Sequence, residues 1–272
     1  MIPIGIMQGR LSKPKDRFQC FPWNSWREEF PLAAEAGFSC IEWIYEQPHE
    51  EENPLGTDEG CEEIRQLSVQ HGVKIQSICA DYYMTNLLLD KEGKVDEEMK
   101  KHLIWLIGRA SKLKMKYIIL PFVDPSSVVG LPLEGLIELL FSLKDILEQH
   151  SLEIHLETDL PPKELAAVLQ KVDHPLIKAN LDTGNSASLG FDAEEELNAI
   201  GPHLGSVHIK DRILNGGTVP LGKGDTDFKT YFRLLKDIGF PGPLILQTAR
   251  DETCSELELA QQNIAFVRKG WG

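Results

Sequence analysis

The chain has 272 residues, of which 42% are hydrophobic and 26% are charged; this is enough apolar material for one large core, and it excludes the disordered and fibrous classes. Lys and Arg number 28 against 42 Asp and Glu, so the formal net charge is −14. A charge of this sign repels phosphate backbones and anionic lipid headgroups, which argues against a nucleic-acid or membrane-surface partner.

Eight short runs rich in apolar and β-branched residues recur along the chain, and each predicts a strand. Segments with helical periodicity separate them, and each is long enough to form a crossover between parallel strands. Three clear examples of these helical segments are 96–113, 133–150 and 228–238. The predicted strands are 2–7, 40–44, 74–79, 117–121, 153–158, 176–181, 206–209 and 244–247.

Residues typical of helix ends support this division of the chain. Ser25 and Glu28 have the spacing of a capping box, and Pro161 and Pro162 suit a first helical turn. Glycine commonly ends a helix with a left-handed residue, and three helical patterns are followed by Gly37, Gly72 and Gly239. The chain therefore alternates between strand and helix.

We expect one domain over residues 1–272, because no linker, low-complexity segment or change of composition divides the chain. Eight strand–helix units in this length predict a (β/α)₈ TIM barrel, a fold that typically takes about 250 residues. A doubly wound open sheet is the alternative, since periodicity does not reveal whether a sheet closes. A homo-oligomer is compatible with either fold.

The cysteines and the N-terminal residues bear on the cellular compartment. Five scattered cysteines without a C-x-x-C pair argue against a disulfide framework and against a thiolate zinc site. Gly5, Gln8 and Arg10 interrupt the first apolar run, so neither a signal peptide nor a membrane span is predicted there. We expect a soluble protein of the reducing cytoplasm.

Polar residues occupy alternate positions in the last four predicted strands, although barrel strands are buried on both faces. If the apolar set packs against the helices, the other set points into the barrel. Its last members then lie together at the carboxyl-terminal rim, where barrel enzymes keep their chemistry. These residues are Glu157, Asp182, His208 and Gln247.

Two carboxylates, an imidazole and an amide oxygen are a ligand set suited to Mn²⁺, Mg²⁺, Zn²⁺ or Fe²⁺. The alternative is internal pairing, since a single buried Asp or His is more often a paired core group. Two unpaired carboxylates in a rim of low dielectric constant are costly, and a bound cation neutralises them. The cluster therefore predicts one divalent metal ion.

Several sequence blocks occur in a fixed order along nearly the whole chain. They are Ile4-Gly5-Ile6-Met7, Ile41-Glu42-Trp43, His155-Leu156-Glu157, Asn180-Leu181-Asp182-Thr183-Gly184-Asn185, Val207-His208-Ile209-Lys210-Asp211 and Gly222-x-Gly224-x-x-Asp227-Phe228. With these blocks the sequence resembles the sugar phosphate isomerase/epimerase family, which has a xylose isomerase-like TIM barrel.

The resemblance implies roles for the rim residues. In that family a Glu, an Asp, a His and a second Glu on the last four strands bind one divalent metal, commonly Mn²⁺, and the two Glu residues exchange protons with the sugar. Glu157, Asp182 and His208 match, and Glu157 is the expected catalytic base. Gln247 replaces the second Glu. Its amide oxygen can bind a metal but takes no proton near neutral pH, which implies weaker metal binding and a single base.

Other polar residues are candidates for binding the substrate, and several have a structural alternative. Arg10 and Arg250 suit either an anionic substrate group or a salt bridge. Glu42 suits a ligand or acid/base role, or pairing with a lysine inside the barrel. The Gly222-Lys223-Gly224 loop resembles a phosphate cradle, but so short a pattern favours a turn. The full set of substrate-binding candidates is Arg10, Glu42, Asp81, Asn185, Lys210, Asp211 and Arg250.

The resemblance implies a metal-assisted isomerase or epimerase that acts on a small carbohydrate or sugar phosphate. With one base, Glu157 can move a proton between neighbouring carbons beside a carbonyl. Two other hypotheses stay open. One is a lyase or dehydratase on the same scaffold, and the other is a sugar-binding barrel that has lost its chemistry together with the strand-eight carboxylate.

Overall fold

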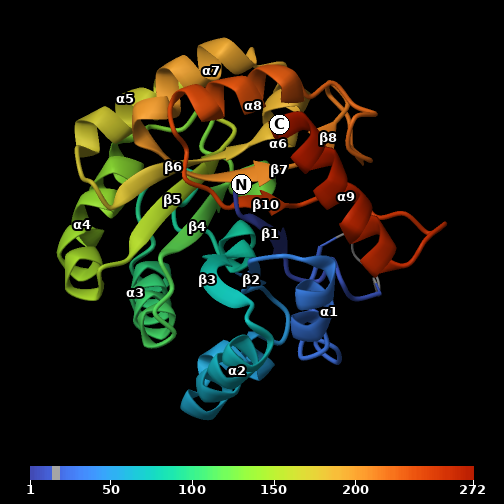
Figure 1. The fold of residues 1–272 in the computed structure, drawn as a ribbon. Helices are drawn as coiled ribbons and strands as arrows, with labels where there is room; N and C mark the ends of the chain where they lie inside the picture. Colours follow the sequence, from blue (N-terminus) through green and yellow to red (C-terminus); the bar gives the residue numbers. More distant parts are fainter. Residues whose placement is uncertain (14–18) are drawn as a thin grey trace.

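The computed structural model describes residues 1–13 and 19–272. Eight parallel strands form a closed barrel in the order β1-β10-β7-β6-β5-β4-β3-β2, with helices around it (Figure 1). This confirms the (β/α)₈ TIM barrel and excludes the open sheet. The barrel strands are β1 (Ile4–Met7), β2 (Cys40–Ile44), β3 (Lys74–Cys79), β4 (Tyr117–Phe122), β5 (Glu153–Thr158), β6 (Ile177–Asp182), β7 (Leu204–Ile209) and β10 (Leu244–Leu246).

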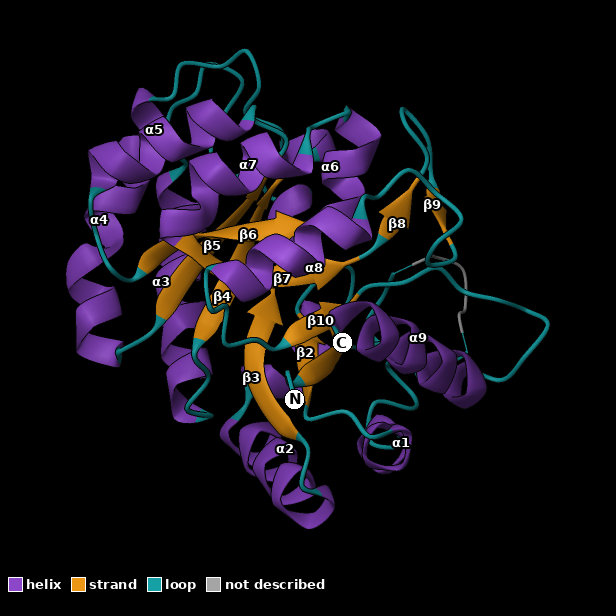
Figure 2. Cartoon of the chain, turned by 45° about the horizontal axis from the view of Figure 1, so that its top comes forward, coloured by secondary structure: helices purple, strands orange, loops and turns teal. Residues whose placement is uncertain are grey.

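Nine α-helices in the described part of the chain lie on the outside of the barrel. A small hairpin of β8 (Asp211–Arg212) and β9 (Thr218–Val219) follows β7 and stands apart from the barrel strands (Figure 2). The helices are α1 (Glu29–Ala36), α2 (Asp58–His71), α3 (Glu97–Lys112), α4 (Glu134–His150), α5 (Pro162–Val172), α6 (Thr183–Leu189), α7 (Ala193–Ile200), α8 (Phe228–Asp237) and α9 (Glu256–Trp271).

Most of the predicted helix ends are confirmed. Pro162 is the first residue of α5, and Gly37 and Gly72 take left-handed conformations directly after α1 and α2. The predicted capping box at Ser25 is wrong, because α1 begins at Glu29 and has no side-chain cap. A helix capped at Ser25 would carry Pro31 beyond its first turn, where the missing N–H breaks the hydrogen-bond ladder.

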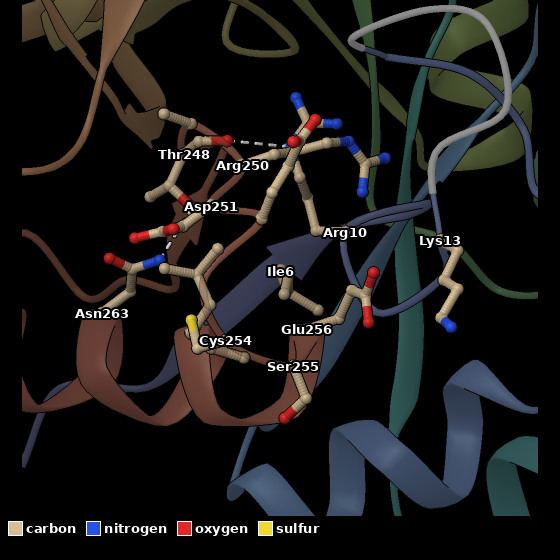
Figure 3. Close-up of a pocket in the computed structure, with 14 residues that line it drawn as sticks. Ile6, Arg10, Lys13, Thr248, Arg250, Asp251, Cys254, Ser255, Glu256 and Asn263 are labelled. Carbon is tan, nitrogen blue, oxygen red and sulfur yellow. Dashed lines mark hydrogen bonds between the residues drawn. The ribbon is translucent and has the colours of Figure 1, made fainter.

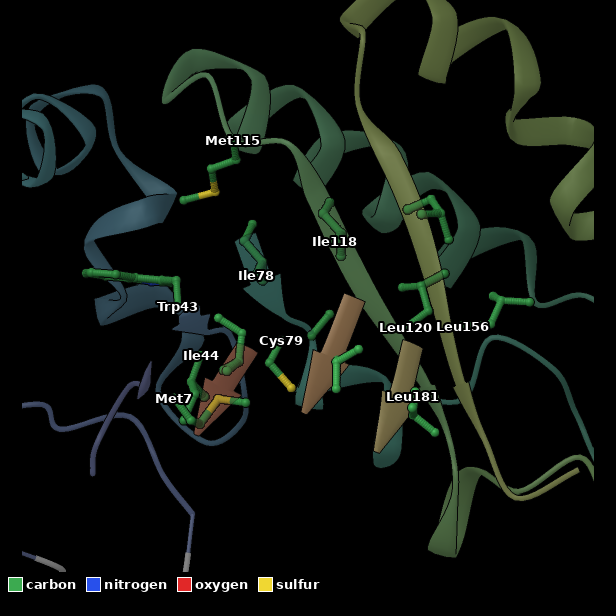
Figure 4. Packing of buried hydrophobic residues seen from close by; sticks show 14 of the residues in the cluster. Met7, Trp43, Ile44, Ile78, Cys79, Met115, Ile118, Leu120, Leu156 and Leu181 are labelled. Atoms are coloured by element: carbon green, nitrogen blue, oxygen red, sulfur yellow. The ribbon is translucent and has the colours of Figure 1, made fainter. Parts of the chain in front are cut away.

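The apolar residues of the strands form one continuous hydrophobic core with the inner faces of the helices. Ile118, Leu120, Leu156 and Leu181 belong to this cluster (Figure 4), and each is at most 1% exposed. In β5, β6 and β7 the alternate residues are polar and point into the barrel. Strand register aligns their ends, since Asp182 pairs with His208 across β6 and β7.

Within the described residues, no helix is both long enough and apolar enough to cross a membrane.

Candidate active site

Three potential metal ligands meet at the carboxyl-terminal ends of adjacent strands. Glu157 comes from β5, Asp182 from β6 and His208 from β7, and all three are buried. One ligand atom from each lies within 4.8 Å of the other two. The Nδ1 atom of His208 is 3.6 Å from Oε2 of Glu157 and 3.9 Å from Oδ2 of Asp182. The structure thus brings together three of the four predicted ligands on one side of the rim.

Asp182 is held in place by the helix that follows it. Its Oδ1 caps the N-terminus of α6 by accepting the backbone N–H groups of Gly184 and Asn185, both at 2.9 Å. This leaves Oδ2 facing His208. Position 184 has no room for a side chain, because a Cβ atom there would lie 2.7 Å from Cγ of Lys210. The Asp-Thr-Gly-Asn block is therefore the local sequence that orients one ligand oxygen.

Glu157 has the surroundings of a proton acceptor. Its Oε1 accepts a hydrogen bond of 2.9 Å from Nδ2 of Asn185. Burial raises the pKa of Glu157 to about 7, and the neighbouring His208 only partly offsets this effect. A carboxyl group with a pKa near neutrality can both take and return a proton, which is what a general base of this kind requires.

His208 is fully buried, and its other ring nitrogen faces a carboxylate. Nε2 lies 2.6 Å from Oε1 of Glu42, which is itself fully buried. Burial alone would lower the pKa of His208, but the nearby carboxylates, above all Glu42, raise it to about 9. Glu42 does not line the cavity described below, and its partner is a histidine rather than the lysine that we expected. This corrects the sequence-based view of Glu42.

Lys210 extends into the space between the ends of β6 and β10. Its Nζ is 3.2 Å from Oδ2 of Asp182, 3.0 Å from Oε1 of Gln247 and 3.3 Å from Oδ1 of Asn185. The Gln247 oxygen therefore accepts a hydrogen bond from a cationic side chain. A glutamate at this position would instead form an ion pair with Lys210.

The donor set fits one divalent cation. Glu157 Oε2, Asp182 Oδ2 and His208 Nδ1 converge as two carboxylate oxygens and one imidazole nitrogen. Metal–ligand bonds of about 2.0–2.2 Å are compatible with ligand atoms spaced in this way. Oxygen and nitrogen donors without thiolate suit Mn²⁺, Mg²⁺, Zn²⁺ or Fe²⁺. The second group of this kind in the described residues, His49, Glu51 and Glu52, is exposed.

A cavity of about 510 Å³ opens beside the ligand cluster, and Glu157 is the cluster residue that lines it. Its lining includes five of the predicted site residues, Asp81, Glu157, Asn185, Lys210 and Gln247. Sequence reasoning missed other polar residues that line it, among them Arg212 and Gln19. Arg212, on β8, donates to Oδ1 of Asn185 at 2.9 Å, and Gln19 links Gln247 to Asp81 through hydrogen bonds of 2.9 and 2.8 Å. Gln19 lies in a loop and Arg212 in the two-residue strand β8, and neither segment is long enough to show the alternation that marks a barrel strand.

Arg10 and Arg250 line a second, neighbouring cavity of about 320 Å³, between the loop after β1 and the start of α9 (Figure 3). Arg10 Nε donates to the carbonyl oxygen of Thr248 at 3.0 Å. Arg250 donates to the carbonyl oxygens of Ser12 and Gly9 at 2.9 and 2.7 Å. Both guanidinium groups therefore tie the loops after the first and last barrel strands to each other, and the structure does not bring them to the ligand cluster.

Asp211 is fully buried and does not line the cavity either. Its Oδ2 accepts the backbone N–H groups of Gly222, Lys223 and Gly224, and its Oδ1 accepts that of Thr226. These bonds correct the predicted substrate role of Asp211. They also occupy the amides that could have formed a phosphate cradle, so the glycine loop is a turn built around a carboxylate.

The sequence matches the family model of the xylose isomerase-like TIM barrel over residues 30–270, and the chain belongs to this family. A putative L-ribulose-5-phosphate 3-epimerase, UlaE, from Shigella dysenteriae is 24% identical over 269 residues, which cover 90% of this chain and 87% of the relative. The corresponding enzyme of Salmonella paratyphi A is 33% identical over 77 residues, but this match spans only 28% of this chain and 27% of the relative.

Solved structures show the same fold at lower identity. A D-psicose 3-epimerase crystallised in the presence of D-fructose superposes with a TM-score of 0.77 at 17% identity and covers 100% of both chains. The IolI protein with a bound zinc atom gives a TM-score of 0.73 at 18% identity and covers 99% of this chain and 96% of its own. At these identities the likeness establishes the barrel architecture.

Proposed function

We propose that the protein is a metal-dependent isomerase or epimerase that acts on a small sugar or sugar phosphate by moving a proton next to a carbonyl. One observation carries the proposal, namely the convergence of Glu157, Asp182 and His208 beside a polar cavity. Family membership and the epimerase relatives support the carbohydrate substrate class. The cavity volume of about 510 Å³ is within the range of about 300–1,000 Å³ for small-molecule sites.

Glu157, Asp182 and His208 would hold the cation, with the Gln247 oxygen as a weaker fourth ligand. When bound, the cation supplies Lewis-acid polarisation of the sugar carbonyl. Mn²⁺ is the metal that we favour, and Zn²⁺, Mg²⁺ and Fe²⁺ suit the same donors. The structurally similar IolI protein has a bound zinc atom, which supports the binding of a divalent ion by this fold.

Glu157 is the base in this proposal. One of its carboxylate oxygens takes the proton from the hydroxyl-bearing carbon beside the carbonyl and returns it to the carbonyl carbon, while the hydroxyl proton passes to the former carbonyl oxygen, so that the carbonyl and the hydroxyl exchange places. Asn185 donates to Oε1 of Glu157 at 2.9 Å and so fixes the orientation of the carboxylate. Lys210 and Arg212, which both line the cavity, are placed to donate to substrate hydroxyl or phosphate oxygens.

The geometry favours a one-base reaction. Gln247 takes no proton near neutral pH. The end of β10 therefore has no carboxylate that could return a proton to the opposite face of the sugar. Exchange of a proton between adjacent carbons by one carboxylate corresponds to aldose–ketose isomerisation. Epimerisation needs a second acid, and Asp81, a partly buried carboxyl that also lines the cavity, is one candidate.

A second candidate function is a sugar-binding barrel without chemistry. Gln247 favours it, since its oxygen is engaged by Lys210 at 3.0 Å and the site lacks the charge of a fourth carboxylate. Both functions require the same cavity, and they differ in whether a cation is held and whether substrate turns over.

The experiment is to load the purified protein with Mn²⁺, desalt it and measure bound metal by elemental analysis, beside the His208→Ala variant. We expect about one equivalent in the wild type and a large loss in the variant. The loaded protein is then assayed on a panel of aldoses, ketoses and their phosphates. Metal binding with turnover supports the enzyme, whereas little metal and no turnover with retained sugar binding would establish the binding protein.

A further inference from the structure

A fully buried carboxylate–imidazole pair lies beneath the cavity floor. Oε1 of Glu42 on β2 is 2.6 Å from Nε2 of His208 on β7, and neither side chain has any exposed surface. The two residues are on strands that are not neighbours in the barrel, so the contact crosses its interior. Because Glu42 does not line the cavity, it is not placed to contact a substrate.

The pairing of β2 with β3 fixes the position of the Glu42 carboxylate. The pairing of β2 with β3 shifts register between Ile41 and Glu42, and Ser77 on β3 donates a hydrogen bond of 2.7 Å to Oε2 of Glu42. One carboxylate oxygen is thus bound by Ser77, and the other faces His208. Carboxylate oxygens accept hydrogen bonds, so Oε1 of Glu42 is an acceptor for a proton on Nε2 of His208.

The other ring nitrogen of His208 points the opposite way. Nδ1 faces Glu157 and Asp182, at 3.6 and 3.9 Å from their oxygens. Nδ2 of Asn180 also lies 3.3 Å from Nδ1. A histidine binds a cation through the lone pair of one ring nitrogen and keeps its proton on the other. When Glu42 accepts the Nε2 proton, Nδ1 is the nitrogen left to bind the cation.

We propose that Glu42 is a positioning residue for the metal site, which keeps the His208 proton on Nε2 and thereby presents the Nδ1 lone pair to the cation. This inference rests on the proposed function, since it requires that a cation bind there. A carboxylate behind a metal-binding histidine fixes its tautomer and ring orientation, and loss of such a partner typically weakens metal binding by about 10–100-fold.

The test uses the full-length protein with two variants at the same position. Glu42→Leu removes the acceptor, and we expect it to weaken Mn²⁺ binding by about 10–100-fold. Glu42→Gln keeps the shape and one acceptor oxygen but loses the charge, and we expect a smaller loss than that of Glu42→Leu. Cys40→Ala is the matched control, because Cys40 is also fully buried two residues earlier on β2. We expect its affinity to stay near that of the wild type.

A spectroscopic readout separates positioning from general damage to the fold. In protein labelled with ¹⁵N-histidine and loaded with diamagnetic Zn²⁺, the wild-type His208 should show a protonated Nε2 and a metal-bound Nδ1. Glu42→Gln should lower the protonated Nε2 signal, or make it exchange faster with water. Glu42→Gln keeps the packing of the barrel, so the test does not depend on Glu42→Leu folding.

These measurements separate the role of Glu42 from metal binding itself. Wild-type affinity and an unchanged His208 spectrum in both Glu42 variants would overturn the positioning role while leaving the metal site intact. If instead the wild type takes up no more metal than His208→Ala, the proposed metal-dependent function is wrong, and the role of Glu42 falls with it.

Discussion

Lys210 donates to the side-chain oxygen of Gln247 across 3.0 Å, and the same ammonium group is 3.2 Å from Oδ2 of Asp182. A positive charge therefore lies between the ends of β6 and β10, next to Asp182, whose carboxylate would hold a cation. Repulsion between Lys210 and a divalent ion weakens metal binding, and a neutral Gln247 does nothing to offset it. A change of charge at position 247 therefore tests how far Lys210 limits metal binding.

Gln247→Glu should tighten Mn²⁺ binding by about tenfold or more, because the new carboxylate adds a charged ligand and forms an ion pair with Lys210. Calorimetric titration with Mn²⁺ measures the change, and Gln247→Leu, which removes the oxygen, should bind more weakly than the wild type. The same Glu variant should gain epimerase activity on ketoses through its second base. Unchanged affinity and unchanged activity would show that position 247 does not limit the site.

Glu157→Gln should lower kcat by about 10²–10⁴-fold, the usual contribution of a general base. The amide cannot accept the proton, although its shape still fills the site. Asp159→Asn is a suitable control, since Asp159 follows the same strand and accepts a hydrogen bond from Ser127, away from the ligand cluster. Full turnover by Glu157→Gln in the metal-loaded protein would mean that another group is the base.

Glu196 should make the protein less stable as the pH rises toward neutrality. Burial raises its pKa from 4.5 to about 7, although Tyr231 and Ser186 donate to its oxygens at 2.6 and 2.8 Å. Between these values the folded state binds more protons than the unfolded chain. The contribution of Glu196 to stability is therefore complete below about pH 4.5 and is lost as the pH rises through 7.

Urea unfolding of the wild type and of Glu196→Gln at several pH values measures this effect. The free energy of unfolding of the wild type, relative to the variant, should fall by about 3 kcal/mol between pH 4.5 and 8, since one pKa unit corresponds to about 1.4 kcal/mol. The comparison cancels the titration of other buried carboxyl groups such as Glu29. A difference that stays constant over this pH range would contradict the prediction.

Asp211→Asn should destabilise the loop at residues 222–226, because the carboxylate accepts four backbone N–H groups there. An amide offers only one oxygen to these donors, and its NH₂ group faces other donors. The free energy of unfolding should fall by about 1–3 kcal/mol. Asp225→Asn removes one exposed acceptor for Leu214 and should cost less. Hydrogen exchange of the loop amides would locate the change.

The strands were predictable because each is buried on both faces, so a run of apolar residues marks it. The predicted bounds differ from the observed ones by two residues at most, as at β1 and β7. Glu157 and His208 were also visible in the sequence, since a polar residue at the end of such a run has few structural explanations. Strand register then fixes which ends become neighbours.

Contacts between distant segments could not be read in the same way. Arg10 and Asp211 lie near the expected rim, but their hydrogen bonds turn them toward backbone groups of other loops. The partner of Glu42 was misjudged because sequence alternation gives the face of a side chain and not its neighbour across the barrel. Arg212 was not predicted, because its position depends on the β8–β9 hairpin and no hydrophobic pattern in the sequence indicates that hairpin.

The barrel is closed by pairing between its first and last strands, where Ile4 lies opposite Leu244 and Ile6 opposite Leu246. A growing polypeptide that has not yet delivered β10 leaves β1 and β7 as two raw edges, each with unsatisfied backbone groups and apolar side chains. The exposed edges of such folding intermediates can pair with strands of other chains. The chain is therefore most prone to aggregate, and most dependent on a chaperone, before β10 pairs with β1.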